Sequence, residues 1–146
     1  MRTVSVVAAL LAAAVSSAAA QRGGGTPTLS VHDAWARPSM PGQTMSAVYA
    51  VVENPGVTPV AITGLGCDVA RSSELHESLE ENGIVRMRPV PKLEVPAGGR
   101  VELRPGGYHV MLMGLTRTLT PGDRVRCLLR AASALVGRFE AEVRAP

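Results

Sequence analysis

Residues 136–144 read VGRFEAEVR and show most clearly which kind of fold the sequence forms. Phe139, Ala141 and Val143 alternate with charged residues along this stretch. A period of two places the apolar side chains on one face of a β-strand and the charged side chains on the other. The stretch therefore predicts a strand with one buried and one solvent-exposed face.

Similar short runs recur along the chain, separated by turns rich in Gly, Pro and Asn. They predict up to ten strands, at residues 29–36, 46–53, 57–65, 72–79, 84–90, 92–95, 100–103, 108–113, 124–130 and 136–144. The best helical rival is 127–136, which is short and has no capping residue. Many short strands with regular turn signals indicate an all-β fold, an antiparallel β-sandwich.

Length and composition exclude several classes of protein. The chain has 146 residues, which fits one domain. Its formal charge is +3, its basic residues are scattered, and only 3% of its residues are aromatic. Nucleic-acid binding needs a basic stripe or stacking platforms, so no nucleic-acid partner is expected.

The first residues have the three-part pattern of a secretory signal peptide. Arg2 precedes an apolar run at 4–15, and Ala18, Ala19 and Ala20 form a small-residue cleavage site. We predict a signal peptide at 1–20, a disordered leader at 21–27 and one folded domain at 28–146; an N-terminal membrane anchor or a buried helix is the alternative. The run is too short to span a bilayer, so no membrane span is expected after cleavage. A lipid anchor is disfavoured, because there is no Cys near residue 20 to carry it.

Two cysteines, Cys67 and Cys127, belong to no metal-binding or redox motif. Three interpretations stay open: a disulfide, two buried thiols, or metal ligands. The sequence also lacks a G-x-S-x-G nucleophile motif and a phosphate-binding glycine loop, and Glu80-Glu81 reads as a solvated hairpin tip. We therefore expect a protein that is not an enzyme.

His and Met residues form the one remaining cluster with a chemical meaning. His76, Met87, His109 and Met111 follow the pattern His-x10-Met-x21-His-x-Met. Asn82-Gly83 predicts a two-residue hairpin turn that makes His76 and Met87 diagonal neighbours. A four-residue loop would place them directly opposite, and either register keeps both on one face of the sheet.

The second half of this cluster lies on a single strand. His109, Met111 and Met113 share one strand face by their period of two. Imidazole and thioether donors without carboxylate or thiolate select Cu(I), and the missing thiolate argues against a blue-copper electron carrier. We expect a shallow site near solvent at one end of the sandwich.

The spacing and its surroundings, ENGIVRMRPV at 81–90 and PGGYHVMLMGL at 105–115, resemble the periplasmic copper chaperones of the PCu(A)C type. The resemblance covers residues from 30 to about 143. It implies a cupredoxin-like Greek-key β-sandwich with one copper, mainly Cu(I), held by the four residues named above. It also implies a periplasmic location and a copper-accepting partner, either a cytochrome c oxidase subunit or another assembly factor.

Three other residues could also contact metal. His32 is outside the spacing and is expected to be a surface or hydrogen-bonded residue. Met40 and Met45 could bind a second copper ion, but packing in the core or a loop is the preferred interpretation. Three functions remain in competition: a copper chaperone, a copper-buffering protein without a dedicated acceptor, and a metal-free structural sandwich. A monomer is expected.

Overall fold

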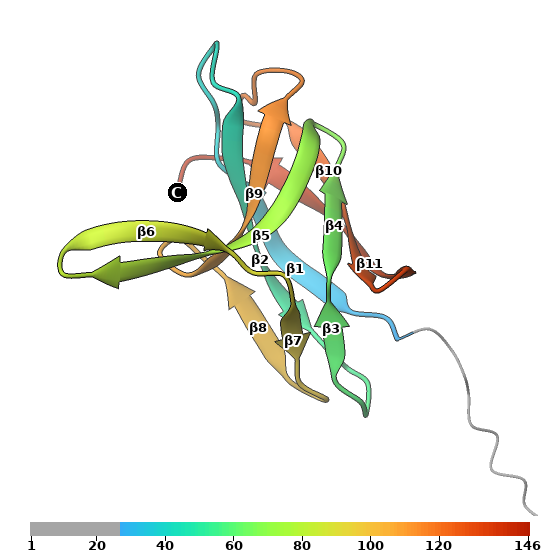
Figure 1. The fold of residues 1–146 in the computed structure, drawn as a ribbon. Helices are drawn as coiled ribbons and strands as arrows, with labels where there is room; N and C mark the ends of the chain where they lie inside the picture. Colours follow the sequence, from blue (N-terminus) through green and yellow to red (C-terminus); the bar gives the residue numbers. More distant parts are fainter. Residues whose placement is uncertain (1–26) are drawn as a thin grey trace, which may run out of the picture.

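The computed structural model describes residues 27–146, in which every regular element is a β-strand (Figure 1). The all-β prediction is confirmed. The predicted signal peptide at 1–20 and all but the last residue of the predicted leader lie outside the described residues. The strands are β1 (Ser30–Ala36), β2 (Met45–Glu53), β3 (Val60–Ile62), β4 (Gly64–Cys67), β5 (Ala70–Glu81), β6 (Ile84–Pro89), β7 (Leu93–Val95), β8 (Arg100–Leu103), β9 (Tyr108–Leu115), β10 (Arg124–Ala131) and β11 (Ala134–Val143).

Nine of these strands form one sheet, which curls around a single core. Its order is β4-β10-β11-β1-β2-β9-β5-β6, with β8 also paired to β2, while β3 and β7 form a separate two-stranded sheet. The sheet curls until β4 lies beside β5, where the backbone N–H of Cys67 donates to the Ser73 hydroxyl at 3.2 Å (Figure 1). The strand pairs are antiparallel except β1 and β11, which are parallel, so the sheet is mixed where we had expected antiparallel pairing throughout.

Two predicted elements differ from the structure. The predicted strand 57–65 is divided at Thr63, because β3 pairs with β7 and β4 pairs with β10. The helical alternative at 127–136 is wrong. That segment is the hairpin between β10 and β11, and Ala132 in its turn has a positive φ of 51°.

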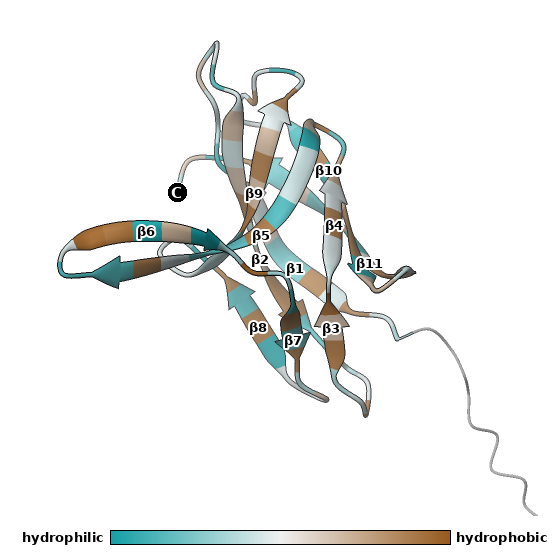
Figure 2. Ribbon diagram, in the orientation of Figure 1, coloured by the Kyte–Doolittle hydropathy of each residue, from teal (hydrophilic) through white to brown (hydrophobic). Residues whose placement is uncertain are grey.

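The core is made of aliphatic side chains that alternate along the strands, as residues 136–144 predicted. In β11, Ala141 and Val143 are fully buried, while Glu140 and Glu142 are exposed. Burial of a side chain such as that of Val143 stabilises the fold by about 1.5–3 kcal/mol. Hydrophilic and hydrophobic residues alternate in the same way along β8 (Figure 2). The largest fully buried apolar side chains are Leu112, Leu119, Leu129, Val48, Val52, Val95, Val110, Val125, Val136 and Val143.

Cys67 of β4 and Cys127 of β10 lie directly opposite each other and form a disulfide. Of the three interpretations left open by the sequence, the disulfide is therefore correct, and free thiols and metal ligation are wrong. No helix in residues 27–146 has the length and apolar character needed to cross a bilayer.

Candidate metal centre

Three of the four predicted ligands lie on one face of two neighbouring strands. His76 of β5 is directly opposite His109 of β9, and Met111 follows on the same side of β9. The other face of these strands carries Val110 and Leu112, which are fully buried in the core. The His/Met face is therefore the face of the sheet directed away from the core.

Met87, the fourth predicted ligand, lies on the hairpin formed by β5 and β6. Its turn is Asn82-Gly83, with positive φ values of 53° and 77°, as a type I′ turn requires. Glu81 pairs with Ile84, and Ser78 therefore lies opposite Met87. This is the two-residue register predicted from the sequence, with Met87 diagonal to His76.

The two imidazoles are a cross-strand pair, with ring centroids 6.1 Å apart. His109 is 3% exposed, and the side chain of His76 is 14% exposed. One nitrogen of each ring, Nδ1 of His76 and Nε2 of His109, is buried without a hydrogen-bond partner. A buried polar atom left unsatisfied costs about 1–3 kcal/mol, so these two nitrogens are the candidate atoms for binding a ligand.

The other nitrogen of each ring is held by an oxygen atom. Nδ1–H of His109 donates to the carbonyl of Gly107 at 3.0 Å, and Nε2–H of His76 donates to the carboxylate of Glu74 at 3.2 Å. An oxygen acceptor on one nitrogen places the proton there and leaves a lone pair on the other. This arrangement, with the second nitrogen bound to carbonyl or carboxylate, is the one typical of metal-binding histidines.

Burial lowers the pKa of His109 below its usual value of 6.5, and electrostatic interactions with His76 and Arg37 lower it further. The hydrogen bond to the Gly107 carbonyl opposes this shift in pKa but does not reverse it. The His109 ring is therefore neutral at physiological pH, which is the form that binds a metal.

Met87, His109 and Met111 line a common hollow of about 470 Å³, together with residues of β2 and the preceding loop. Arg37, Met45 and Tyr49 are among these other lining residues. Met87 is 57% exposed, whereas the imidazoles are buried. The expectation of a shallow site holds for the thioether of Met87, which is at the surface. It does not hold for the two imidazoles, which lie deeper among neighbouring side chains.

The cover over His109 includes two aromatic rings. The ring of Tyr49 is centred 6.3 Å from that of His109, and the ring of Trp35 is centred 4.5 Å from that of Tyr49. Arg144 lies over the other end of this row, 5.6 Å from the centre of the Trp35 ring. With the ring of His76, the row of rings crosses the four adjacent strands β1, β2, β9 and β5. Its contacts restrict the orientation of the His109 ring.

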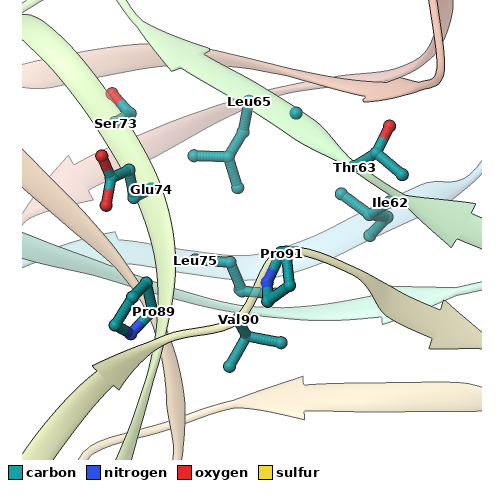
Figure 3. Close-up of a pocket in the computed structure, with 10 residues that line it drawn as sticks. Ile62, Thr63, Leu65, Ser73, Glu74, Leu75, Pro89, Val90 and Pro91 are labelled. Atoms are coloured by element: carbon teal, nitrogen blue, oxygen red, sulfur yellow. The ribbon is translucent and has the colours of Figure 1, made fainter.

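Among residues 27–146, no group of three or more His, Cys, Asp and Glu side chains is placed to hold a metal ion. A second hollow, of about 340 Å³, lies between β4, β5 and the segment after β6 (Figure 3). Its lining is mostly aliphatic side chains and prolines, and Glu74 lies at its border. None of the four predicted ligands lines it, so the hollow beside Met111 is the better candidate.

His32 lies apart from this cluster. Its Nδ1 contacts Asp33 at 2.9 Å and its Nε2 contacts Glu53 at 3.1 Å, which raises its pKa. The interpretation of a hydrogen-bonded surface residue is confirmed. Met40 and Met45 are 71% and 48% exposed, so neither packs in the core.

The sequence analysis missed two residues that shape the site. Glu74 is two residues before His76, a spacing that places it on the same strand face and within reach of the ring. Tyr49 could not be found in this way, because its contact with His109 depends on the pairing of β2 with β9.

The sequence matches, over residues 29–143, the family described as "Putative lipoprotein LpqE-like". It is 34% identical over 103 residues to "Putative lipoprotein Lxx21020" of Leifsonia xyli subsp. xyli, in an alignment covering 70% of this chain. The chain spans 61% of the length of that relative.

Two solved structures have the same architecture. One is titled "Copper-bound PCuAC domain from PmoF2", with a TM-score of 0.67, 23% identity, and coverage of 84% of this chain and 97% of that one. The other is the solution structure of CuI-DR1885 from Deinococcus radiodurans, with a TM-score of 0.63, 30% identity, and coverage of 86% and 85%. The expected cupredoxin-like fold is confirmed by these likenesses. With the family match spanning the whole folded part, they show that the chain belongs to the LpqE-like family, which is the PCuAC family.

Proposed function

We propose that this protein is an exported copper chaperone, which binds one Cu(I) ion through His76, Met87, His109 and Met111 and passes it to a copper-accepting protein. The proposed acceptor is a cytochrome c oxidase subunit or another factor that assembles its copper centre. Copper is the cargo of the protein and takes part in no reaction on it.

The observation that carries this proposal is the pair of buried imidazole nitrogens without partners, Nδ1 of His76 and Nε2 of His109. The rings face each other across two strands, and Met87 and Met111 border the hollow beside them. Two neutral imidazoles and two thioethers form a soft donor set, which favours Cu(I) over Mg²⁺, Ca²⁺, Mn²⁺ and Zn²⁺. The Glu74 carboxylate supplies negative charge near the bound cation.

The uneven exposure of the four ligands supports transfer by ligand exchange. Met87 is 57% exposed on a hairpin that projects from the body of the fold (Figure 1), and the imidazoles are buried. A donor atom of the acceptor can therefore replace Met87 first, while the histidines still hold the ion. A thioether is also the weaker donor, so the exchange begins at the bond that breaks most readily.

The family membership supports this cargo, since the related domains in the two solved structures are described as copper-bound and Cu(I)-bound. The family name and the L. xyli relative both describe lipoproteins, which are exported proteins. The disulfide between Cys67 and Cys127 agrees with an oxidising compartment such as the periplasm. We propose a periplasmic monomer.

A competition titration tests the binding step. We expect one tight equivalent of Cu(I) per chain when the metal is supplied under anaerobic, reducing conditions with a chromophoric Cu(I) chelator as competitor. Trp35 is the sole tryptophan of the sequence and lies two rings from His109, so its fluorescence provides a second signal. If the protein cannot compete for Cu(I) even with a weak chelator, the proposed copper binding is wrong and a metal-free structural role remains.

A transfer experiment separates a chaperone from a copper buffer. In stopped-flow mixing with a copper-free acceptor domain, ligand exchange predicts a rate that rises with acceptor concentration. A rate equal to spontaneous release at every acceptor concentration would favour buffering, which is the second candidate function.

A further inference from the structure

The methionines of this fold have an unusual distribution. Methionine normally fills gaps in hydrophobic cores. Here none of the five methionines in residues 27–146 is buried in the core or packed against it. Met111 and Met113 are half-buried, and the others are exposed. Since these side chains do not fill the core, their thioether sulfur atoms are free to bind a ligand.

Two of these methionines form a pair that the proposed copper site does not use. Met45 of β2 lies directly opposite Met113 of β9, and Ala47 lies opposite Met111. Met45, Met111 and Met113 are therefore on the same face of the sheet as His109. Side chains directly opposite in an antiparallel pair have Cβ atoms about 5 Å apart, so two long thioethers can reach one ion.

The chemistry around this pair suits a soft monovalent cation. Met45 lines the same hollow as Met111 and Met87, so the pair adjoins the proposed copper site. Ser72 lies opposite Met113 on the β5 side, and the nearest carboxylate on that strand face, Glu74, lies opposite Met111. A set of neutral thioethers binds Cu(I) and discriminates against hard cations and Zn²⁺.

We propose that Met45 and Met113, with Met111 at the boundary between the two sites, form a second Cu(I) site built from thioethers alone. This inference rests on the proposed function and deepens it, since Met45 lines the same hollow as Met87, His109 and Met111. Lacking imidazole, the second site binds more weakly than the site with the two histidines. The Met45–Met113 pair lies two residues along β9 from Met111, the proposed ligand that the two sites have in common.

Methyl-resolved NMR of the full folded chain with ¹³C-methyl-labelled methionine tests this inference. Under anaerobic, reducing conditions, the first equivalent of Cu(I) is expected to shift the methyl signals of Met87 and Met111. The second equivalent is expected to shift those of Met45 and Met113. Zn²⁺ at the same concentrations should leave the last two signals in place.

Three substitutions complete the experiment. Met45→Leu and Met113→Leu should each abolish the second equivalent and change the affinity of the first by less than about threefold, because leucine preserves size and removes the sulfur donor. Met40→Leu is the matched control, since it removes an exposed thioether from the turn before β2, and it should leave both equivalents intact.

The two proposals fail in different ways. If Met45 and Met113 signals stay in place through several equivalents of Cu(I), or shift together with the first equivalent, the second site is wrong and the first is unaffected. If Met87 and Met111 do not respond to the first equivalent, the proposed function itself is wrong. A second equivalent that survives in Met45→Leu would also overturn the thioether site.

Discussion

His76 and His109 lie directly opposite each other on β5 and β9, with ring centroids 6.1 Å apart. Each ring has one nitrogen bonded to an oxygen acceptor and the other buried without a partner. The oxygen acceptors differ, since Glu74 holds Nε2 of His76 and Gly107 holds Nδ1 of His109. In the proposed site, Nδ1 of His76 and Nε2 of His109 are therefore the two imidazole donors.

The first prediction concerns the soft donors. Met111→Leu keeps the size and apolar character of the position and removes the sulfur atom, so folding should be almost unchanged. Cu(I) affinity should fall at least about tenfold, which corresponds to about 1.4 kcal/mol of binding free energy. Chelator competition measures the affinity, and Leu112→Met on the buried face is the control. Equal affinity in wild type and Met111→Leu would remove Met111 from the site.

The second prediction concerns Glu74 as a positioning residue. Glu74→Leu removes the acceptor for Nε2–H of His76, so the ring should populate both tautomers and Cu(I) affinity should fall by about 10–100-fold. Glu74→Gln retains an acceptor oxygen, so its Cu(I) affinity should fall less than that of Glu74→Leu. The ¹⁵N chemical shifts of the His76 ring report the tautomer directly.

Glu102→Leu, on β8, is the control for this experiment, because Glu102 is an exposed strand carboxylate that lies opposite Val51 of β2 and not opposite either histidine. It should alter neither the His76 tautomer nor the affinity. A wild-type His76 ring that carries its proton on Nδ1 would contradict the role assigned to Glu74.

The third prediction is a pH dependence of the metal-free protein. The folded-state pKa of His109 is lowered by burial, so between that pKa and the unfolded value of 6.5 the unfolded chain binds more protons. The stability due to neutral His109 is therefore complete above pH 6.5 and is lost as the pH falls below it. One such group changes the free energy of unfolding by up to about 1.4 kcal/mol per pH unit.

Urea unfolding of the metal-free protein between pH 7.5 and pH 5 measures this effect. His109→Asn is the comparison, because its amide nitrogen takes the position of Nδ1, which keeps a donor for the Gly107 carbonyl, and it does not titrate. The difference in stability between the two proteins should depend on pH, whereas the raised pKa of His32 acts equally in both. Parallel stability curves would show that His109 does not change its pKa on folding.

The fourth prediction concerns the disulfide. Cys67 and Cys127 are 60 residues apart in sequence, and closing a loop of this length stabilises a fold by about 4 kcal/mol through the entropy of the unfolded chain. The double variant Cys67→Ala, Cys127→Ala should lose a large part of this stability in denaturant unfolding. Its first-site Cu(I) affinity should stay within about twofold of wild type, because β4 and β10 supply no proposed ligand. A large loss of affinity in a folded double variant would mean that the disulfide helps to form the site.

The hairpin that carries Met87 shows how far local sequence can predict this fold. Asn82 and Gly83 tolerate positive φ, so they select a two-residue turn, and the turn determines the register of His76 with Met87. The charged alternation at 138–144 predicted β11 and its buried face in the same way. Both signals are local, because side-chain period and turn chemistry act over a few residues.

Contacts between distant segments were decided by the tertiary structure. The period of two places His109 and Met111 on one face of their strand, but only the pairing of β5 with β9 places His76 on that face and directly opposite His109. The division of the predicted strand 57–65 at Thr63 follows from a change of partner, from β7 to β10. Neither partner can be identified from the residues of the segment alone.

The sequence by itself determined the strand pattern, the donor chemistry, the face that His76 shares with Met87 and the face that His109 shares with Met111 and Met113, because these depend on residue type, turn chemistry and a period of two. The tertiary structure decided the disulfide, the hydrogen bonds from Glu74 and Gly107 that orient the two rings, and the pairing of Met45 with Met113. It also decided that the imidazoles are buried and Met87 is exposed. These features depend on strand partners far apart in the chain, which are selected by the packing of the whole core and not by any local stretch of sequence.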